Sequence, residues 1–483
     1  MCVCVCISFL DFLNIFKMSK KEMQYRKIFI IIIFCLINLI NYMDRFTVAG
    51  ILNDIQVEFK MNESQSGFLQ TAFILSFFVV APLIGYLGDR MSRKYIMLYG
   101  IFFWNLSTII GSFMPTYNLF LVFRCFVGIG EASFTTIAPT IISDIFTNET
   151  RSRVLALFYL AIPVGCGLGY IVSSKFANFF NNWRYGLRIT PCVGSIAGLL
   201  FLCFFKEPLR GENEEEDEKE EEEGDEKWQF IRDLKYLFVI KSYILSTLGY
   251  VCATFVAGAL AWWGSLFFKL SIQIQNSPNT SIENVDFIFG SVAVFAGIVG
   301  VITGAILSEK LRNKICSSDP IICGTGLILS TPLLSVAIYL ARTNIILSFV
   351  ASFFGQLFLN MNWAIVTDML LYLVMPTKRS FAAAVQVLLA HALGDAGSPY
   401  FVGFLADALY SNHTIIETFT TTVTPFVDVY KLEKFFSIQS ALYYCLIVNI
   451  LGAIFFYASA CFINTDYSIS RDLAFRNQKC QQP

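Results

Sequence analysis

The chain has 483 residues, of which 56% are hydrophobic and 15% are charged. One soluble core cannot bury so much apolar surface, so the composition excludes an ordinary soluble protein and indicates a lipid environment. The net charge of -1 is unevenly distributed, because residues 212–226 hold twelve acids and one Lys. Such an acidic run stays solvated and does not pack, which is typical of a linker.

Apolar segments of about 20 residues, the length that crosses a bilayer, recur along the chain. Hydropathy predicts six spanning helices before the acidic run, near residues 28–52, 66–88, 95–114, 118–145, 154–178 and 186–206. Six more are predicted after it, near 241–268, 287–308, 320–340, 345–374, 381–409 and 438–463. The predicted fold is an all-α polytopic membrane protein with twelve transmembrane helices in two six-helix bundles.

These helices divide the chain into five predicted parts. A cytosolic N-terminal segment (1–27) precedes the N-terminal bundle (28–206), and the C-terminal bundle (241–463) is followed by a cytosolic tail (464–483). The linker (207–240) carries the acidic run. It ends in KWQFIRDLKYLFVI, which mixes large apolar residues with Lys and Arg, and we expect an amphipathic helix on the cytosolic leaflet there.

Basic residues set the orientation. Eighteen Lys and Arg fall in 17–27, 90–94, 151–153, 310–314, 378–379 and 471–479, all on one predicted side, and the opposite loops hold far fewer. The positive-inside rule therefore places both termini and the acidic linker in the cytosol.

The two predicted halves correspond to each other in position. GYLGDRMSRK at 85–94 matches GAILSEKLRNK at 304–314, and TIISDIFTNETRSR at 140–153 matches AIVTDMLLYLVMPTKRS at 364–380. An internal repeat of this kind is typical of a transporter built from two bundles.

GYLGDRMSRK also resembles the signature loop of the major facilitator superfamily, with Ser92 where the signature usually has Gly. The resemblance implies that Asp89, Arg93 and Asp144 form a charge cluster that gates the cytosolic face by holding it closed in the outward-open state. The residues alone also allow a simpler interpretation, in which Arg93 and Lys94 only anchor the loop in the cytosol.

A second resemblance covers most of the chain. Its strings are NYMDRFTVAGIL (41–52), RCFVGIGEASFTTIAPTIISD (124–144), RSRVLALFYLAIPVGCGLGYI (151–171), MNWAIVTDMLLYLVMPTKRS (361–380) and HALGDAGSPY (391–400). Together they resemble the Spinster family. The resemblance implies proton-linked carriage of single-chain lipids: lysophospholipids out of lysosomes, or sphingosine or sphingosine-1-phosphate across the plasma membrane.

Ionisable residues within a membrane are costly unless they are paired or hydrated, so each is a functional candidate. Arg124 and Glu131 lie two turns apart on one face of a predicted helix, and we expect them to pair. Asp44 and Arg45 lie on the first helix, which packs beside it in this superfamily. A partner that changes during transport could switch the protonation of Glu131 or Asp44 and so couple protons to movement. The alternative is a static salt-bridge network that only holds the two helices together.

Other candidates concern the substrate. The planar guanidinium groups of Arg45 and Arg124 suit a phosphate head group. His391 and Asp395 lie one turn apart, and His titrates most easily between cytosolic and lysosomal pH. We expect His391 to contribute to proton coupling and Asp395 to substrate binding, with a packing role as the alternative for His391.

Other classes of function fit less well. Only His391 and His413 are present, too few for a di-iron enzyme, and no Cys/His metal cluster or phosphate-binding Gly loop occurs. A transport-dead scaffold or receptor would have no evident use for buried charges. We expect a monomeric carrier, not an enzyme, in the lysosomal or late endosomal membrane or alternatively the plasma membrane. Its partners would be a lysolipid or sphingolipid substrate, protons and membrane lipid, with no metal, cofactor or nucleic acid.

Glycosylation tests the orientation. The sequons at Asn62, Asn279 and Asn412 fall on the predicted extracytosolic side, whereas Asn105 falls within the membrane and Asn148 on the cytosolic side. Glycosidase treatment of single-sequon variants should show glycans at the first three positions only. A glycan at Asn148 would mean that the topology is inverted.

Overall fold

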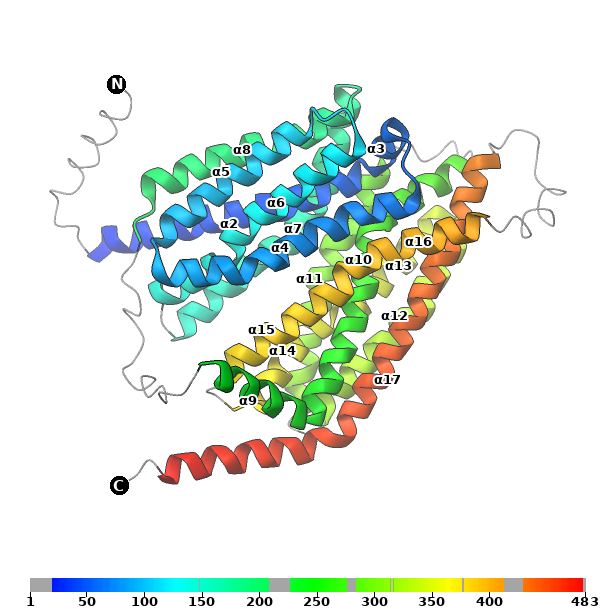
Figure 1. Ribbon diagram of the computed structural model, residues 1–483. Helices are drawn as coiled ribbons and strands as arrows, with labels where there is room; N and C mark the ends of the chain where they lie inside the picture. The colour runs from blue at the N-terminus through cyan, green and yellow to red at the C-terminus, as the bar shows by residue number, and fades with distance from the viewer. Residues whose placement is uncertain are drawn as a thin grey trace, which may run out of the picture.

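The computed structural model describes residues 20–146, 148–207, 226–275, 284–312, 314–315, 317–375, 378–411 and 429–480. These residues are organised as helices (Figure 1). In this described part, eleven helices are long and apolar enough to cross a membrane. A further helix of 19 residues, α5 (Arg93–Gly111), packs against α6 and α8 and completes twelve.

The N-terminal bundle contains α2 (Lys20–Gly50), α4 (Glu63–Arg90), α5, α6 (Tyr117–Ile145), α7 (Asn148–Phe179) and α8 (Trp183–Phe204). The predicted first span, 28–52, ends earlier than expected, because α2 stops at Gly50. A separate short helix, α3 (Leu52–Phe59), follows it. Asn62 then begins α4 with a capping box, in which its side chain accepts from the backbone N–H of Gln65 and the Gln65 side chain accepts from the Asn62 N–H.

The C-terminal bundle contains α10 (Lys241–Gln275), α11 (Val285–Arg312), α12 (Ser318–Leu340), α13 (Ile345–Asn360) with α14 (Asn362–Leu373), α15 (Arg379–Leu389) with η4 (Ala390–Asp395) and α16 (Gly397–Ser411), and α17 (Val429–Cys480). The short helix α9 (Glu226–Val239) precedes it. The predicted last span is the middle of α17, which continues to Cys480 and turns across the end of the bundle (Figure 1).

Small residues let the helices of each bundle approach closely. A side chain on Gly130 of α6 would meet the backbone of α5, since a Cβ there would lie 2.8 Å from the Trp104 nitrogen and 3.0 Å from the Gly100 oxygen. Lipid tails are as apolar as the helix surfaces, so such close packing, rather than apolar burial, draws membrane helices together.

The two bundles meet at the end that carries α3 and the start of α4, and their ribbons diverge toward the end that carries α9 (Figure 1). Contacts between the bundles join α4 to α16, α7 to α11 and α2 to α10. Thr71 donates to the Ala396 carbonyl at 2.5 Å, the Trp262 indole donates to the Ser66 carbonyl at 3.2 Å, and Tyr170 donates to the Ala261 carbonyl. We call this end, on the predicted extracytosolic side, the closed end.

Candidate functional site

The structure brings together the four charged residues that the sequence singled out on the first and fourth spans. Asp44 and Glu131 are fully buried, Arg124 is 3% exposed, and the Arg45 side chain is 14% exposed. Two carboxylates and two guanidinium groups therefore lie between α2 and α6, inside the N-terminal bundle. We call these four residues the charge cluster.

Asp44 is held by two hydroxyl groups from other helices. Thr108 of α5 donates to one carboxylate oxygen at 3.1 Å, and Thr190 of α8 donates to the other. A buried carboxylate without water needs such donors, so these threonines fix its position and satisfy its charge.

Glu131 pairs with Arg45 rather than with Arg124. One of its oxygens lies 3.2 Å from Arg45 Nη2, and the other has no hydrogen-bond partner. The sequence suggested Arg124 as the partner because both residues lie on one face of α6. In the folded bundle, α2 packs beside that face of α6, and Arg45 of α2 forms the ion pair with Glu131 instead.

Arg124 is a buried cation without a hydrogen bond. None of its three guanidinium nitrogens has a hydrogen-bond partner. The guanidinium lies 4.9 Å from the centre of the Phe73 ring, and the Arg45 guanidinium lies 5.1 Å from the same ring. Arg124 also lines a small cavity with Ser107, Thr108, Gly111, Phe120, Phe123, Val127 and Leu187. A desolvated guanidinium that faces a cavity is suited to bind an anionic group.

The predicted cytosolic cluster is partly described. Arg93 pairs with Asp144 at 2.6 Å. Asp89 lies in the last turn of α4, but its side chain falls outside the described residues. Glu207, which the sequence did not single out, also joins this cluster, since it accepts from Ser92 Oγ at 2.5 Å and from the Arg93 backbone N–H at 2.9 Å.

The protonation of Glu207 follows from these contacts. Partial burial raises its pKa, but the hydrogen bonds from Ser92 and from the backbone of Arg93 and Lys94 outweigh burial and hold the pKa below its ordinary value. The residue that begins the linker is thus a stable anion bound to the loop between α4 and α5.

His391 and Asp395 form a pair on η4, the π-helical turn of the eleventh span. His391 Nδ1 lies 2.6 Å from Asp395 Oδ2, and both side chains are partly exposed. The imidazole stacks on Phe78 of α4 with ring centres 5.7 Å apart, so the pair lies where the two bundles face each other. Single π-helical turns often mark functional sites in helices.

Sequence reasoning missed Thr108, Thr190, Phe73 and Glu207. Thr and Phe are ordinary residues of apolar helices, and no local pattern distinguishes those that contact a charge. Glu207 directly follows a predicted span, and this position was the one feature of the sequence that could have drawn attention to it.

The two other sequons of the predicted extracytosolic side, Asn279 and Asn412, lie outside the described residues. Asn62 is exposed at the start of α4, and Asn105 is buried within α5. In the described part of the chain, no group of three or more His, Cys, Asp or Glu side chains is placed to hold a metal ion.

Two packed helical bundles with buried charged side chains in both are the architecture expected of a membrane transporter. Comparisons with known proteins agree, because the family model of the Major Facilitator Superfamily matches residues 34–399. The chain is 44% identical to Protein spinster of Drosophila melanogaster over 94% of its length and 80% of the relative's. It is 42% identical to human Protein spinster homolog 1 over 91% and 82%. The chain belongs to the Spinster family of major facilitator transporters and is a multi-pass integral membrane protein.

Solved structures confirm the predicted twelve-helix fold. A bacterial homolog of the human lysosomal transporter Spinster, in an inward-facing and unoccupied conformation, matches with a TM-score of 0.78 at 18% identity, over 93% of this chain and 99% of that one. A D-xylose-proton symporter matches with a TM-score of 0.65 at 16% identity, over 89% and 96%. At these identities the likeness concerns the fold alone.

The threonine contacts lead to a testable expectation. Thr190→Val removes a hydroxyl donor from the buried Asp44 carboxylate and should destabilise the protein by about 1–3 kcal/mol. In an Asp44→Asn background the same change should cost much less, because the charge that needs the donor is gone. Thermal unfolding of the four purified proteins measures the coupling. Thr303→Val, at an exposed threonine of α11 that donates within its own helix, is the control. Equal losses in both backgrounds would contradict the role assigned to Thr190.

Proposed function

We propose that the chain is a proton-coupled secondary transporter that moves lysophospholipids or related single-chain lipids from the lysosomal lumen to the cytosol by alternating access. The observation that carries this proposal is Arg124, a buried guanidinium without a hydrogen bond that lines a cavity. A charge held in this way inside a membrane protein needs an occasional partner to offset its cost.

Arg124 is proposed to bind the head group of the lipid. Its planar donors suit a phosphate, and Arg45 offers a second guanidinium beside the same Phe73 ring. The cavity beside Arg124 is lined mainly by Phe, Val and Leu, apart from two hydroxyl groups. This cavity has room for about one water molecule, so the acyl chain is proposed to lie outside it, along apolar helix surfaces.

Glu131 is proposed to take up the proton. Its ion pair with Arg45 uses one carboxylate oxygen and leaves the other free. Protonation would cancel the negative charge and release Arg45, so the cluster would change from neutral to a charge of +1. An anionic head group would then bind more tightly, which links proton uptake to lipid binding. Asp44, held by its two threonines, would remain the fixed counter-charge of Arg124.

The same scheme gives roles to the other candidates. The His391–Asp395 pair lies between the bundles and would meet the substrate or a proton as the bundles move. Arg93 and Asp144, with Asp89, would gate the cytosolic end. The lysosomal location is supported by the description of the human relative of the bacterial homolog as the lysosomal transporter Spinster, since this chain is itself similar to human Protein spinster homolog 1.

Lipid flux in reconstituted vesicles tests the proposal. A pH difference of two units is worth about 2.7 kcal/mol per proton, so one coupled proton can raise lysophospholipid accumulation about 100-fold. Glu131→Gln should still move lipid down its gradient but should lose this accumulation. Arg124→Lys should lose flux in both conditions, because a point charge does not reproduce a bidentate contact.

Glu309→Gln, which removes an exposed carboxylate of α11, is the matched control and should behave as the unmodified chain. Parallel assays with sphingosine and sphingosine-1-phosphate decide the substrate, since preferred flux of either would favour the plasma-membrane exporter instead. Flux that ignores the gradient in the unmodified chain would make it a uniporter and would refute coupling.

A further inference from the structure

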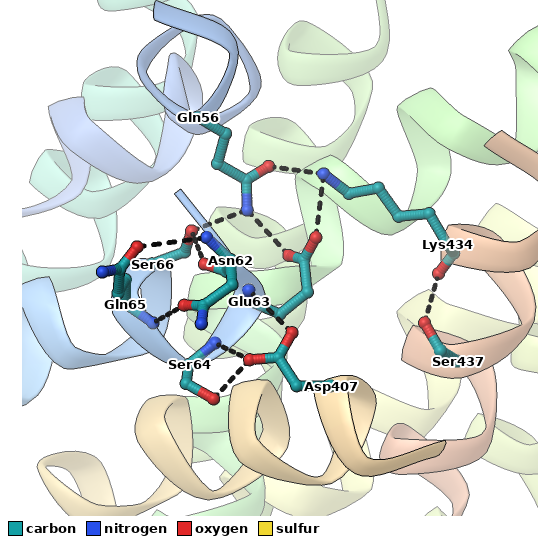
Figure 2. A network of polar contacts seen from close by, with 9 residues as sticks. All are labelled: Gln56, Asn62, Glu63, Ser64, Gln65, Ser66, Asp407, Lys434 and Ser437. Atoms are coloured by element: carbon teal, nitrogen blue, oxygen red, sulfur yellow. Dashed lines mark hydrogen bonds and ion pairs between the residues drawn. The ribbon is translucent and has the colours of Figure 1, made fainter. Parts of the chain in front are cut away.

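The closed end contains a buried polar network that links the two bundles (Figure 2). Its centre is Lys434 of α17, which is 8% exposed and belongs to the C-terminal bundle. Lys434 Nζ lies 3.0 Å from Glu63 Oε1 of α4 and 2.8 Å from Gln56 Oε1 of α3, both on the N-terminal side. We call Gln56, Glu63 and Lys434 the closed-end triad.

Gln56 connects the two charges of the triad. Its amide oxygen accepts from Lys434, and its amide nitrogen donates to Glu63 Oε2 at 2.7 Å and to Ser66 Oγ at 2.7 Å. The Gln56 amide oxygen thus accepts from the Lys434 ammonium group, and the amide nitrogen donates to the Glu63 carboxylate (Figure 2). Because Lys434 comes from the opposite bundle, its two bonds exist only while the closed end is shut.

Neighbouring contacts hold the acceptors in place. Asp407 of α16 accepts from the backbone N–H groups of Glu63 at 3.0 Å and Ser64 at 2.8 Å, and so caps α4 from across the interface. On the far side of α3, Glu58 pairs with Arg184 and accepts from the Trp183 indole. Helix α3 is therefore bound to its own bundle while Gln56 reaches the other.

The fit at this interface is close. A Cβ at Gly403 of α16 would lie 2.2 Å from the Glu63 carbonyl oxygen, and one at Gly67 of α4 would lie 2.1 Å from the Pro399 carbonyl oxygen. Two glycines thus let the backbones of α4 and α16 touch beside the triad.

We propose that the closed-end triad is the gate that holds the extracytosolic end shut and sets the balance between the two states of the transport cycle. The inference rests on alternating access in the proposed function. A buried charge that loses its partner costs far more than an intact pair, and removal of both charges together costs little. The gate therefore depends on matched charges and not on either residue alone.

Amide hydrogen exchange of the full-length protein in lipid nanodiscs tests the gate without a transport assay. The N–H groups at the start of α4 are bonded to Asp407 only when the end is shut, so deuterium uptake in residues 60–70 and 399–408 reports opening. Glu63→Gln and Lys434→Met should each raise that uptake severalfold. The double variant Glu63→Gln, Lys434→Met should return it toward the unmodified level.

Further variants sharpen the test. The reversed pair Glu63→Lys, Lys434→Glu should also restore protection, because a half-turn of the Gln56 amide presents the donor to the new carboxylate. Lys310→Met removes an exposed Lys at the predicted cytosolic end of α11 and should leave the uptake unchanged. Uptake in α5 and α6 checks folding. If a single variant unfolds, the neutral change Gln56→Leu serves in its place and should also open the end.

Unchanged uptake in the folded single variants, or equal uptake in single and double variants, would overturn the gate. This outcome is separate from that of the proposed function, because exchange reports the closed end whether or not lipid is carried. A functioning gate with no lipid flux would leave the triad intact and refute the substrate assignment.

Discussion

Charges inside a membrane protein must be neutralised by other groups of the protein, and this requirement shapes the N-terminal bundle. Asp44, Arg124 and Glu131 are buried, and Arg45 is largely buried, between helices that lipid surrounds, where an unpaired charge is expensive. Two threonines satisfy Asp44, Arg45 neutralises Glu131, and Arg124 retains unused donors beside a cavity. Glycines let the helices around the cluster approach one another closely.

Charged side chains find their partners differently at the two ends of the bundles. At the predicted cytosolic end, Arg93, Asp144 and Glu207 form ion pairs within the N-terminal bundle. At the closed end, Lys434 forms its ion pair across the interface. A pair within one bundle can persist when the bundles separate, whereas a pair across the interface must break. The proposed cytosolic gate would therefore act through contacts of Arg93 and Asp144 with the other bundle, in addition to their own pair. The charge cluster lies between these two ends. A change in its charge can therefore shift the equilibrium between the two states of the transport cycle only through contacts that differ between those states.

Much of the fold could be predicted from the sequence, because about 20 apolar residues per span, basic loops and the internal repeat are properties of the chain itself. The charges on α2 and α6 were found for the same reason, since ionisable residues are conspicuous in apolar helices. Their pairing was not predicted. Helical spacing suggested that Arg124 pairs with Glu131, but α2 packs beside α6 and its Arg45 forms the ion pair with Glu131. Thr190 and Lys434 could not be predicted, because each acts through a residue far away in the chain.

The central claim is that Glu131 carries the coupled proton while Arg124 binds the lipid. Simultaneous measurement of lipid and proton movement, in vesicles loaded with a pH-sensitive dye, tests it most directly. The account predicts that an imposed lysophospholipid gradient drives proton movement in the unmodified chain and none in Glu131→Gln, although lipid still moves in that variant. Equal proton movement per lipid in both proteins would contradict it.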